Sequence, residues 1–259
     1  MRNAVGWSGL AASLVFVAVA IGVSASQRLS LEREMVVAVG RSLVQLLIVG
    51  VALVAVVDDD TPLIWSWLWV AVIVVFAGAT VARRVPTIPG MLSVAVGANA
   101  VVAAASLAIV YGFEIFPLSG RTLVPVAGMT IGNALKSGVV GATRVAEIAG
   151  DHRAEIEARL ALGLPGRDAL RPFLRSALRT AISPQIENTA GLGIVFLPGA
   201  MTGLILAGVS PMAAVRTQLA LMYVILAGVA ITTIVIVLGA ARLLMTTDDR
   251  LLPVARRMH

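Results

Sequence analysis

The 259-residue sequence has no cysteine and only two histidines, His152 and His259. The lack of cysteine excludes disulfide bonds, thiolate metal sites and cysteine nucleophiles, and it leaves the redox compartment of the protein open. Two histidines are too few for a histidine-rich metal cage. No Gly-Lys-Ser or Gly-Lys-Thr is present, so the chain has no phosphate-binding loop with which to hydrolyse ATP alone. We expect no cofactor bound by this chain.

Charge is also scarce, since 13% of the residues are charged and 59% are hydrophobic, with a mean hydropathy of +0.96. Several apolar runs exceed the roughly 20 residues that a helix needs to cross a bilayer, and the short alternating segments of a barrel are not visible. The basic residues flank these runs with few aromatics between them, which argues against nucleic acid as a partner. We predict an all-α, polytopic transmembrane bundle in the lipid bilayer, forming a single domain over residues 1–259.

The apolar runs predict seven spans. The first ends at Val23-Ser24-Ala25, which resembles a signal-peptidase site, but Arg2 is the only charge before it, so we favour a retained anchor. The seven predicted spans are Trp7 to Ala25, Met35 to Val57, Ile64 to Ala82, Met91 to Gly112, a fifth from Leu123, Ile186 to Ala207, and Ala213 to Arg242.

The distribution of basic residues predicts the orientation of these spans. Most of the 20 lysines and arginines fall in the first, third and fifth links and in the tail. By the positive-inside bias these segments are cytoplasmic. We therefore expect a multi-pass protein of the cell membrane with the N-terminus outside and the C-terminus in the cytoplasm. The aspartates at 58–60 then lie outside, where a solvated loop is a simpler explanation than a cation site.

The segment 144–183 is dense in charge and must lie in water, because each charge at the hydrocarbon centre costs about 2.5 to 3.5 kcal/mol. It predicts a helix from Glu147 to Leu162 that continues the fifth span and stops at Gly163-Leu164-Pro165-Gly166. A second helix starts near Arg167, and its arginines recur every four residues, at Arg167, Arg171, Arg175 and Arg179. This basic amphipathic helix could lie on anionic lipid or bind a soluble cytoplasmic partner.

Polar side chains inside the spans are candidates for a transport pathway. Lys136 should pair with Glu187 or face a hydrated vestibule, because a buried charge must be paired or hydrated. Asn133 and Gln45 lie deep in their spans, where hydrogen bonding between helices is the competing explanation. For Arg41, Glu187 and Arg216, which lie near span ends, snorkelling to the interface competes.

Leu197-Pro198-Gly199 interrupts the predicted sixth span. Proline removes a backbone donor and glycine adds flexibility, so the helix should kink or break there. A broken helix exposes backbone groups that can line a pathway, although a purely structural kink is the alternative.

Two sequence patterns resemble known transporter families. Glu157-Ala158-Arg159 followed by Gly163 is similar to the Glu-Ala-Ala and glycine signature in the cytoplasmic loop of ABC importer permeases, with Arg159 in place of the second alanine. More of the chain, from about residue 30 to 245, resembles the iron-export ABC permease family, to which plant aluminium-sensitivity permeases are also similar. The matching residues are Arg41 with Gln45, Pro125, Ala127-Gly128-Met129, Gly132-Asn133, Leu197 to Gly203, Ile205 to Gly208, Pro211, Arg216 and Gln218, whereas Leu204 stands where many members carry glutamine.

This resemblance implies a permease subunit that exports iron or a related metal, pairs with a separately encoded ATP-binding subunit and forms a homodimer. ATP would be used by the partner. The ATPase-docking candidates in the cytoplasmic coupling loop are Glu157, Gly163, Arg167, Arg171 and Arg175. The pathway candidates are Gln45, Asn133, Lys136, Glu187, Pro198, Gly199, Met201, Thr202 and Gly203.

Other functions remain open from the sequence. No residues have metal-ligand spacing, although Met129 or Met201 could supply soft ligands. An ion-coupled secondary transporter would need acidic or histidine relays in the membrane, and Glu187 is the one carboxylate near a span. An ABC permease for another small solute, such as a sugar nucleotide, is a further alternative. An enzyme would need a paired catalytic set, and none is visible, so we predict that the chain is not an enzyme.

Overall fold

The computed structural model describes residues 7–56, 61–194, 197–246 and 248–252, and within them the chain forms nine α-helices and no β-strand. The predicted all-α bundle is thus confirmed. The aspartates at 58–60 and His259 lie outside the described residues. The chain divides into two compact units, residues 1–58 and 59–259.

The first unit is a helical hairpin of α1 (Trp7–Ser26) and α2 (Glu32–Val56). The Ser24 hydroxyl donates to the Glu32 carboxylate across the link, at 2.9 Å. Both helices match the predicted first and second spans to within a few residues.

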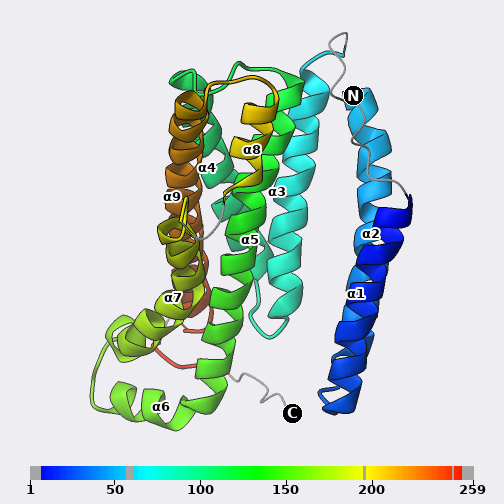
Figure 1. The fold of residues 1–259 in the computed structure, drawn as a ribbon. Helices are drawn as coiled ribbons and strands as arrows, with labels where there is room; N and C mark the ends of the chain where they lie inside the picture. Colours follow the sequence, from blue (N-terminus) through cyan, green and yellow to red (C-terminus); the bar gives the residue numbers. More distant parts are fainter. Residues whose placement is uncertain (1–6, 57–60, 195–196, 247, 253–259) are drawn as a thin grey trace. The chain divides into compact units, whose positions relative to one another are not determined.

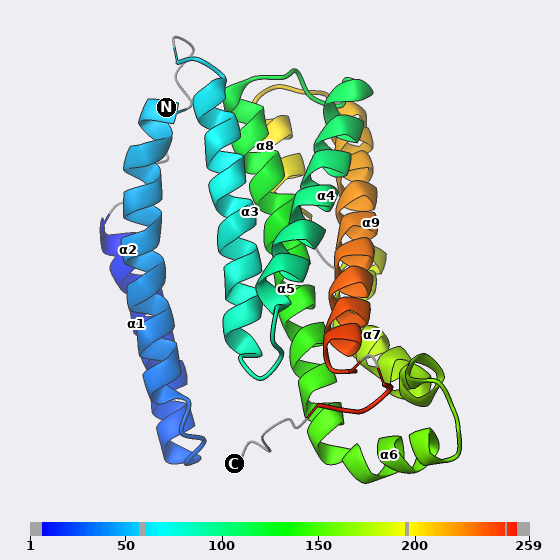
Figure 2. The ribbon, with the colours of Figure 1, turned by 180° about the vertical axis from the view of Figure 1, so that it is seen from behind.

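The second unit contains the remaining helices (Figure 1). Four of them are long: α3 (Ile64–Arg84), α4 (Met91–Gly112), α5 (Gly120–Asp151) and α9 (Pro211–Leu243). Figure 2 shows α4 between α3 and α9 on the far side of this unit. The three shorter helices are α6 (Arg153–Ala161), α7 (Gly166–Ala190) and α8 (Gly199–Leu206).

Glycines set the register of the long helices, because α9 approaches α4 and α5 where side chains are missing. A Cβ added to Gly239 would lie 2.4 Å from the Val94 side chain, and one on Gly138 would lie 2.7 Å from Ile236. Gly228 approaches Val102 and Thr130 in the same way. From Gly228 to Gly239 along α9, the partner on α4 changes from Val102 back to Val94, so α9 is antiparallel to α4. From Gly228 to Ile236, the partner on α5 changes from Thr130 forward to Gly138, so α9 is parallel to α5.

The segment predicted as the sixth span returns the chain between α5 and α9, which are parallel. In the described residues, six helices are long and apolar enough to cross a membrane: α1 to α5 and α9. Because α5 and α9 run in the same direction, the chain must return between them to the end from which α5 starts. Helices α7 and α8 make this return, separated by a non-helical segment from Gly191 to Pro198. The break predicted at Leu197-Pro198-Gly199 is confirmed, and the prediction of about seven crossings is consistent with the structure.

The helix predicted from Glu147 to Leu162 continues the fifth span as far as Asp151, but it is not one unbroken helix. It breaks at His152, whose φ of −102° and ψ of 20° end α5 and precede α6. The turn brings α6 back toward the bundle, where Ile156 is fully buried in the same apolar cluster as Val145 and Leu170. A straight helix would carry Ile156 away from this cluster, so burial of one apolar side chain accounts for the difference.

Close packing of α3 against α4 gives a stability prediction. A Cβ on Gly78 would lie 2.4 Å from the Val96 side chain and 2.7 Å from its backbone nitrogen, so the helices would have to separate. We expect Gly78→Ala to destabilise the protein by about 1–3 kcal/mol and to lower its Tm in detergent. Gly97→Ala, where the added Cβ meets no atom within 4 Å, is the matched control. Equal Tm values for the two variants would contradict the close contact.

Candidate transport pathway and docking surface

One face of α5 is polar although it lies on the surface of the second unit. Exposed or half-buried positions follow each other every three or four residues along this face, which we call the α5 polar stripe. Its members are Gly128, Met129, Gly132, Asn133, Lys136, Val140, Thr143, Arg144 and Glu147. The outward faces of the neighbouring helices differ, since they carry large apolar side chains such as Phe76 on α3 and Ile234 and Leu238 on α9.

The packing of α5 against α3 shows how far each residue of the stripe lies along the apolar part of the bundle. The approach of Gly138 to Val81 puts Asn133 about level with Phe76, well inside the apolar segment of α3. Lys136 lies one turn further along and is exposed. An exposed lysine at a depth where neighbouring helices present apolar side chains cannot face lipid without a large cost. This face of α5 is therefore suited to a water-filled pathway or to contact with another protein surface.

The sequence left open a hydrogen bond from Asn133 to another helix and an ion pair between Lys136 and Glu187, and the described structure shows neither. The Asn133 amide donates to the Met129 carbonyl of its own helix, at 2.8 Å, rather than to another helix. Glu187, on α7, lies about level with Lys136 because Ala181 packs against Gly141. Within the described residues the two charges form no ion pair, and both side chains are exposed. The ion pair with Glu187 is therefore not formed in the described structure, and a hydrated vestibule stays the other prediction for Lys136.

Two shallow hollows adjoin at Thr180 on α7. One, of about 470 Å³, is lined by Val139, Val140, Thr143, Arg144 and Glu147 of α5 together with Thr180. The other, of about 390 Å³, is lined by Pro172, Arg175, Ser176, Arg179, Thr180 and Ser183 of α7. The half of the stripe nearer to α6 thus continues onto a basic, hydroxyl-rich face of α7.

The other pathway candidates lie on different elements. Pro198 is the N-cap of α8, which carries Gly199, Met201, Thr202 and Gly203. Thr202 and Gly203 are exposed, and Met201 is half-buried. Helix α8 packs on the first part of α9 and lies beside the upper half of α5 in the view of Figure 1. Gln45 lies on α2, in the first unit.

The docking candidates gather on α6, α7 and the turn between them. Glu157, Arg167, Arg171 and Arg175 are exposed, and Gly163 turns the chain with a φ of +85°. Helix α6 and the first half of α7 are fixed to the bundle by a shared apolar cluster that contains Ile156, Leu170, Leu174 and Ala177. Arg159 stacks over the Phe173 ring at 5.4 Å, which links α6 to α7 directly. We call α6 and the first half of α7, residues 153–180, the cytoplasmic hairpin, after the side of the membrane that the sequence predicts for it.

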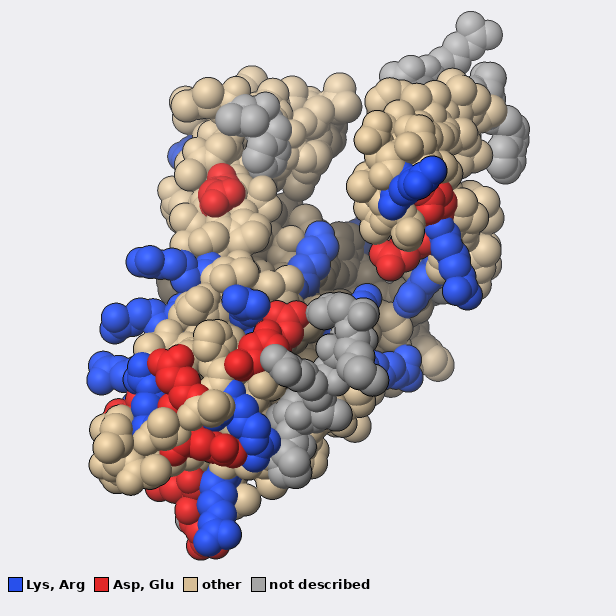
Figure 3. Space-filling model, turned by 90° about the horizontal axis from the view of Figure 1, so that it is seen from below, with Lys and Arg blue, Asp and Glu red and all other residues tan. Residues whose placement is uncertain are grey.

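Charge on the cytoplasmic hairpin is unevenly paired. Its ion pairs include Arg153 with Glu157 at 2.8 Å and Arg159 with Glu155 at 2.9 Å, both on α6. Within the described residues, no carboxylate lies at ion-pair distance from Arg171 or Arg175 on α7. Figure 3 looks at this end of the unit and shows acidic and basic side chains gathered closely together there. The unpaired cations of α7 are available to an acidic surface.

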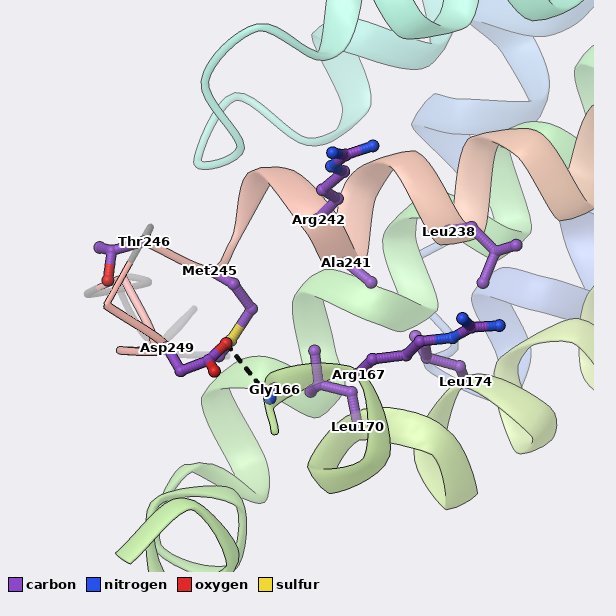
Figure 4. Close-up of a pocket in the computed structure, with 10 residues that line it drawn as sticks. All are labelled: Gly166, Arg167, Leu170, Leu174, Leu238, Ala241, Arg242, Met245, Thr246 and Asp249. Carbon is purple, nitrogen blue, oxygen red and sulfur yellow. Dashed lines mark hydrogen bonds between the residues drawn. The ribbon is translucent and has the colours of Figure 1, made fainter. Parts of the chain in front are cut away.

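A larger cavity, of about 610 Å³, separates α7 from the end of α9 (Figure 4). Arg167, Leu170 and Leu174 line one side, and Leu238, Ala241 and Arg242 line the other. The chain after α9 closes one end with Met245, Thr246 and Asp249. Arg167 therefore lines this cavity, whereas Arg171 and Arg175 do not.

Sequence reasoning missed two hydroxyl side chains buried in the bundle, which lie near Asn99, the strongly polar residue of the fourth span. Thr232 and Thr233 are fully buried on α9, and their hydroxyl oxygens have no hydrogen-bond partner within the described structure. Asn99 is 1% exposed and donates to the Ala95 carbonyl of its own helix. The register of α4 and α9 places Asn99 about level with Thr232. A hydroxyl in an apolar span gives little signal in the sequence, because threonine is tolerated on either face of a membrane helix.

No residues in the described structure form a metal site by position. Groups of three or more histidine, aspartate or glutamate side chains close enough to hold an ion do not occur there. Met129 and Met201 lie on different helices, α5 and α8.

Comparison with known proteins identifies the family. Residues 7–245 match the family described as "Uncharacterised protein family (UPF0014)". The chain belongs to this family. The match covers both units and all nine helices, so the stripe and the cytoplasmic hairpin are within the family's common region.

Three relatives in the family carry informative names. The chain is 33% identical to "UPF0014 membrane protein STAR2" of Oryza sativa subsp. japonica, over 86% of this chain and 78% of the relative. It is 31% identical to "Protein ALUMINUM SENSITIVE 3" of Arabidopsis thaliana, over 86% of this chain and 82% of the relative. It is 28% identical to "Probable iron export permease protein FetB" of Escherichia coli (strain K12), over 87% of each chain. No solved structure matches the chain.

These comparisons confirm the resemblance drawn from the sequence and establish a polytopic membrane protein of a permease family. The individual pathway and docking residues remain predictions.

Cysteine labelling tests whether the α5 polar stripe faces water, and the natural chain offers no competing thiol. We expect Lys136→Cys and Asn133→Cys to react with a hydrophilic maleimide at least about tenfold faster than Ile234→Cys, because the reactive thiolate needs water. Ile234 is the matched control, since the packing of Gly138 on Ile236 places it at the depth of Lys136 on an outward apolar face. Similar labelling rates at the three positions would contradict a hydrated stripe.

Proposed function

We propose that the chain is the transmembrane subunit of an ABC exporter, working as two permease copies with two separately encoded ATP-binding subunits. The observation that carries this proposal is the cytoplasmic hairpin. It is held to the bundle by buried apolar side chains and presents Arg171 and Arg175 without internal partners. A surface that is fixed to the bundle and carries arginines without ion-pair partners suits binding to a soluble protein better than binding to lipid alone.

The proposed orientation places the cytoplasmic hairpin, the end of α3 and the end of α9 in the cytoplasm, with the N-terminus outside. Arg83, Arg84 and Arg242 lie at these helix ends. Their position agrees with the positive-inside bias.

The proposed mechanism is alternating access. When the ATP-binding subunits close, they move the cytoplasmic hairpin, which shares its apolar cluster with α5 and α9. Movement of α5 relative to a second copy changes the side from which the α5 polar stripe is reached. ATP binds to the partner subunit only, since this sequence contains no phosphate-binding loop.

Iron or a related metal is the first candidate cargo, and the name of the Escherichia coli relative supports it. The second candidate is an anionic solute such as a sugar nucleotide. It is favoured by the positive charge along the cytoplasmic half of the pathway, where Lys136 and Arg179 have no acidic partner in the described structure. A bare metal cation would be repelled by these residues.

Transport in inside-out membrane vesicles tests the function and distinguishes the two cargoes. Vesicles that contain the chain and its ATP-binding subunit should take up labelled ferrous iron when ATP is added. Replacing the phosphate-loop lysine of the ATP-binding subunit should abolish uptake. ATP-dependent uptake of a labelled sugar nucleotide without iron uptake would select the second cargo. Uptake of iron that depends on a proton gradient and not on ATP would favour a secondary transporter instead.

Docking is tested by reversing charge on α7. We expect Arg171→Glu with Arg175→Glu to lower the affinity for the ATP-binding subunit at least about tenfold, because like charges placed opposite each other cost several kcal/mol. Arg171→Lys with Arg175→Lys is the matched control and should keep most of the affinity. Binding is measured by co-purification, and membrane insertion should be equal in both variants. Undiminished binding of the reversed pair would remove these arginines from the docking surface.

A further inference from the structure

The segment after α9 folds back as a compact loop. The Leu252 amide donates to the Leu244 carbonyl at 2.9 Å, and the Thr246 amide donates to the Arg250 carbonyl at 2.9 Å. An isolated antiparallel bridge joins Met245 and Leu251. Leu244 and Leu251 are 1% and 5% exposed and belong to the apolar cluster beneath the cytoplasmic hairpin. We call residues 244–246 and 248–252 the C-terminal clip.

The C-terminal clip holds α7 through Asp249. The N-cap of α7 is Pro165, which makes no side-chain capping bond. The Asp249 carboxylate accepts a hydrogen bond from the Gly166 amide at 3.2 Å, so it supplies the missing cap from a distant part of the chain (Figure 4). A carboxylate at a helix N-terminus is also favoured by the helix dipole. Asp249 adopts a φ of +52°, which aspartate and asparagine tolerate better than most residues.

The C-terminal clip holds α6 through Arg153. The Arg153 guanidinium donates to the carbonyls of Leu251 and Leu252, both at 3.2 Å. The same guanidinium forms the 2.8 Å ion pair with Glu157, a docking candidate. Arg153 therefore connects the proposed docking surface to the chain that leaves α9.

We propose that Arg153 and Asp249 are positioning residues that make α9 move with the cytoplasmic hairpin when ATP is used. This inference rests on the proposed function. The apolar cluster seats the cytoplasmic hairpin, and the C-terminal clip fixes the start of both α6 and α7 to the end of α9. Without the clip, movement of the ATP-binding subunits tilts α6 and α7 relative to the bundle and does not move α9. ATP is then hydrolysed with less transport.

The first test measures the clip in the permease alone, by amide hydrogen exchange in detergent. Asp249→Ala and Arg153→Ala should each speed exchange of the α6 amides and the first α7 amides about tenfold, because hydrogen bonds to charged groups are worth roughly that factor. Exchange in α4 and α5 should not change. Asp248→Ala, which removes the adjacent exposed carboxylate, is the matched control, and Asp249→Asn should restore slow exchange because it keeps an acceptor and tolerates positive φ.

The second test measures transport per ATP hydrolysed with the ATP-binding subunit present. Asp249→Ala should lower this ratio several-fold while ATP hydrolysis and co-purification persist, and Arg153→Ala should lower the ratio too. A variant that was merely misfolded would lose subunit binding as well. Gly166→Ala approaches the clip from the other side, since its Cβ would lie 2.5 Å from Met245 and 2.7 Å from the Asp249 carboxylate, and it should lower the ratio too.

The outcomes separate this inference from the proposed function. An unchanged ratio in the Asp249 and Arg153 variants, or an equal fall in Asp248→Ala, overturns the positioning role while ATP-driven transport by the natural chain stands. No ATP-driven transport by the natural chain overturns the proposed function and the positioning role together. Faster exchange confined to the cytoplasmic hairpin would then still show that the clip holds it.

Discussion

The structure of the second unit depends on the close approach of α9 to α4 and α5 at positions without side chains. In a bilayer, apolar side chains gain little by leaving lipid for each other, so van der Waals contact at short range must stabilise the bundle. Gly138, Gly228 and Gly239 permit that contact, and each leaves no room for an added methyl group without movement of a neighbour. The register that results determines which side chains of α5 remain outside the bundle.

The remaining outward face of α5 is incompatible with lipid. Asn133 lies on it at the depth of Phe76 and Lys136 one turn further along, and the outward faces of α3 and α9 at similar depth are apolar. A monomer surrounded by lipid would have to bury the lysine or bend the bilayer around it. The proposed second copy, with water between the two stripes, would hydrate the charge without either cost. Polar residues of α7 continue the stripe in the direction of α6.

The spans could be predicted closely from the sequence, because long apolar runs bounded by charges leave few alternatives. The fourth span matches α4 at both ends, and the break at Pro198 follows from proline chemistry. The turn at His152 could not be predicted, since it depends on Ile156 reaching a cluster built from distant helices. The C-terminal clip could not be predicted from the sequence either. Its contacts join Asp249 to Gly166 and Arg153 to Leu251, and nothing local in the sequence indicates such pairs.

The two ion pairs described within the cytoplasmic hairpin contribute little to its position. Pairs such as Arg159 with Glu155 lie in water, where each is worth about 0.2–1 kcal/mol and is formed within one helix. Such pairs stabilise α6 without fixing where α6 lies. Its position depends instead on Ile156, which is fully buried, and on the bonds from Arg153 to backbone carbonyls beyond α9. An element held in this way moves as a body with the helix to which it is attached, which is the property that transmission of force across a membrane requires.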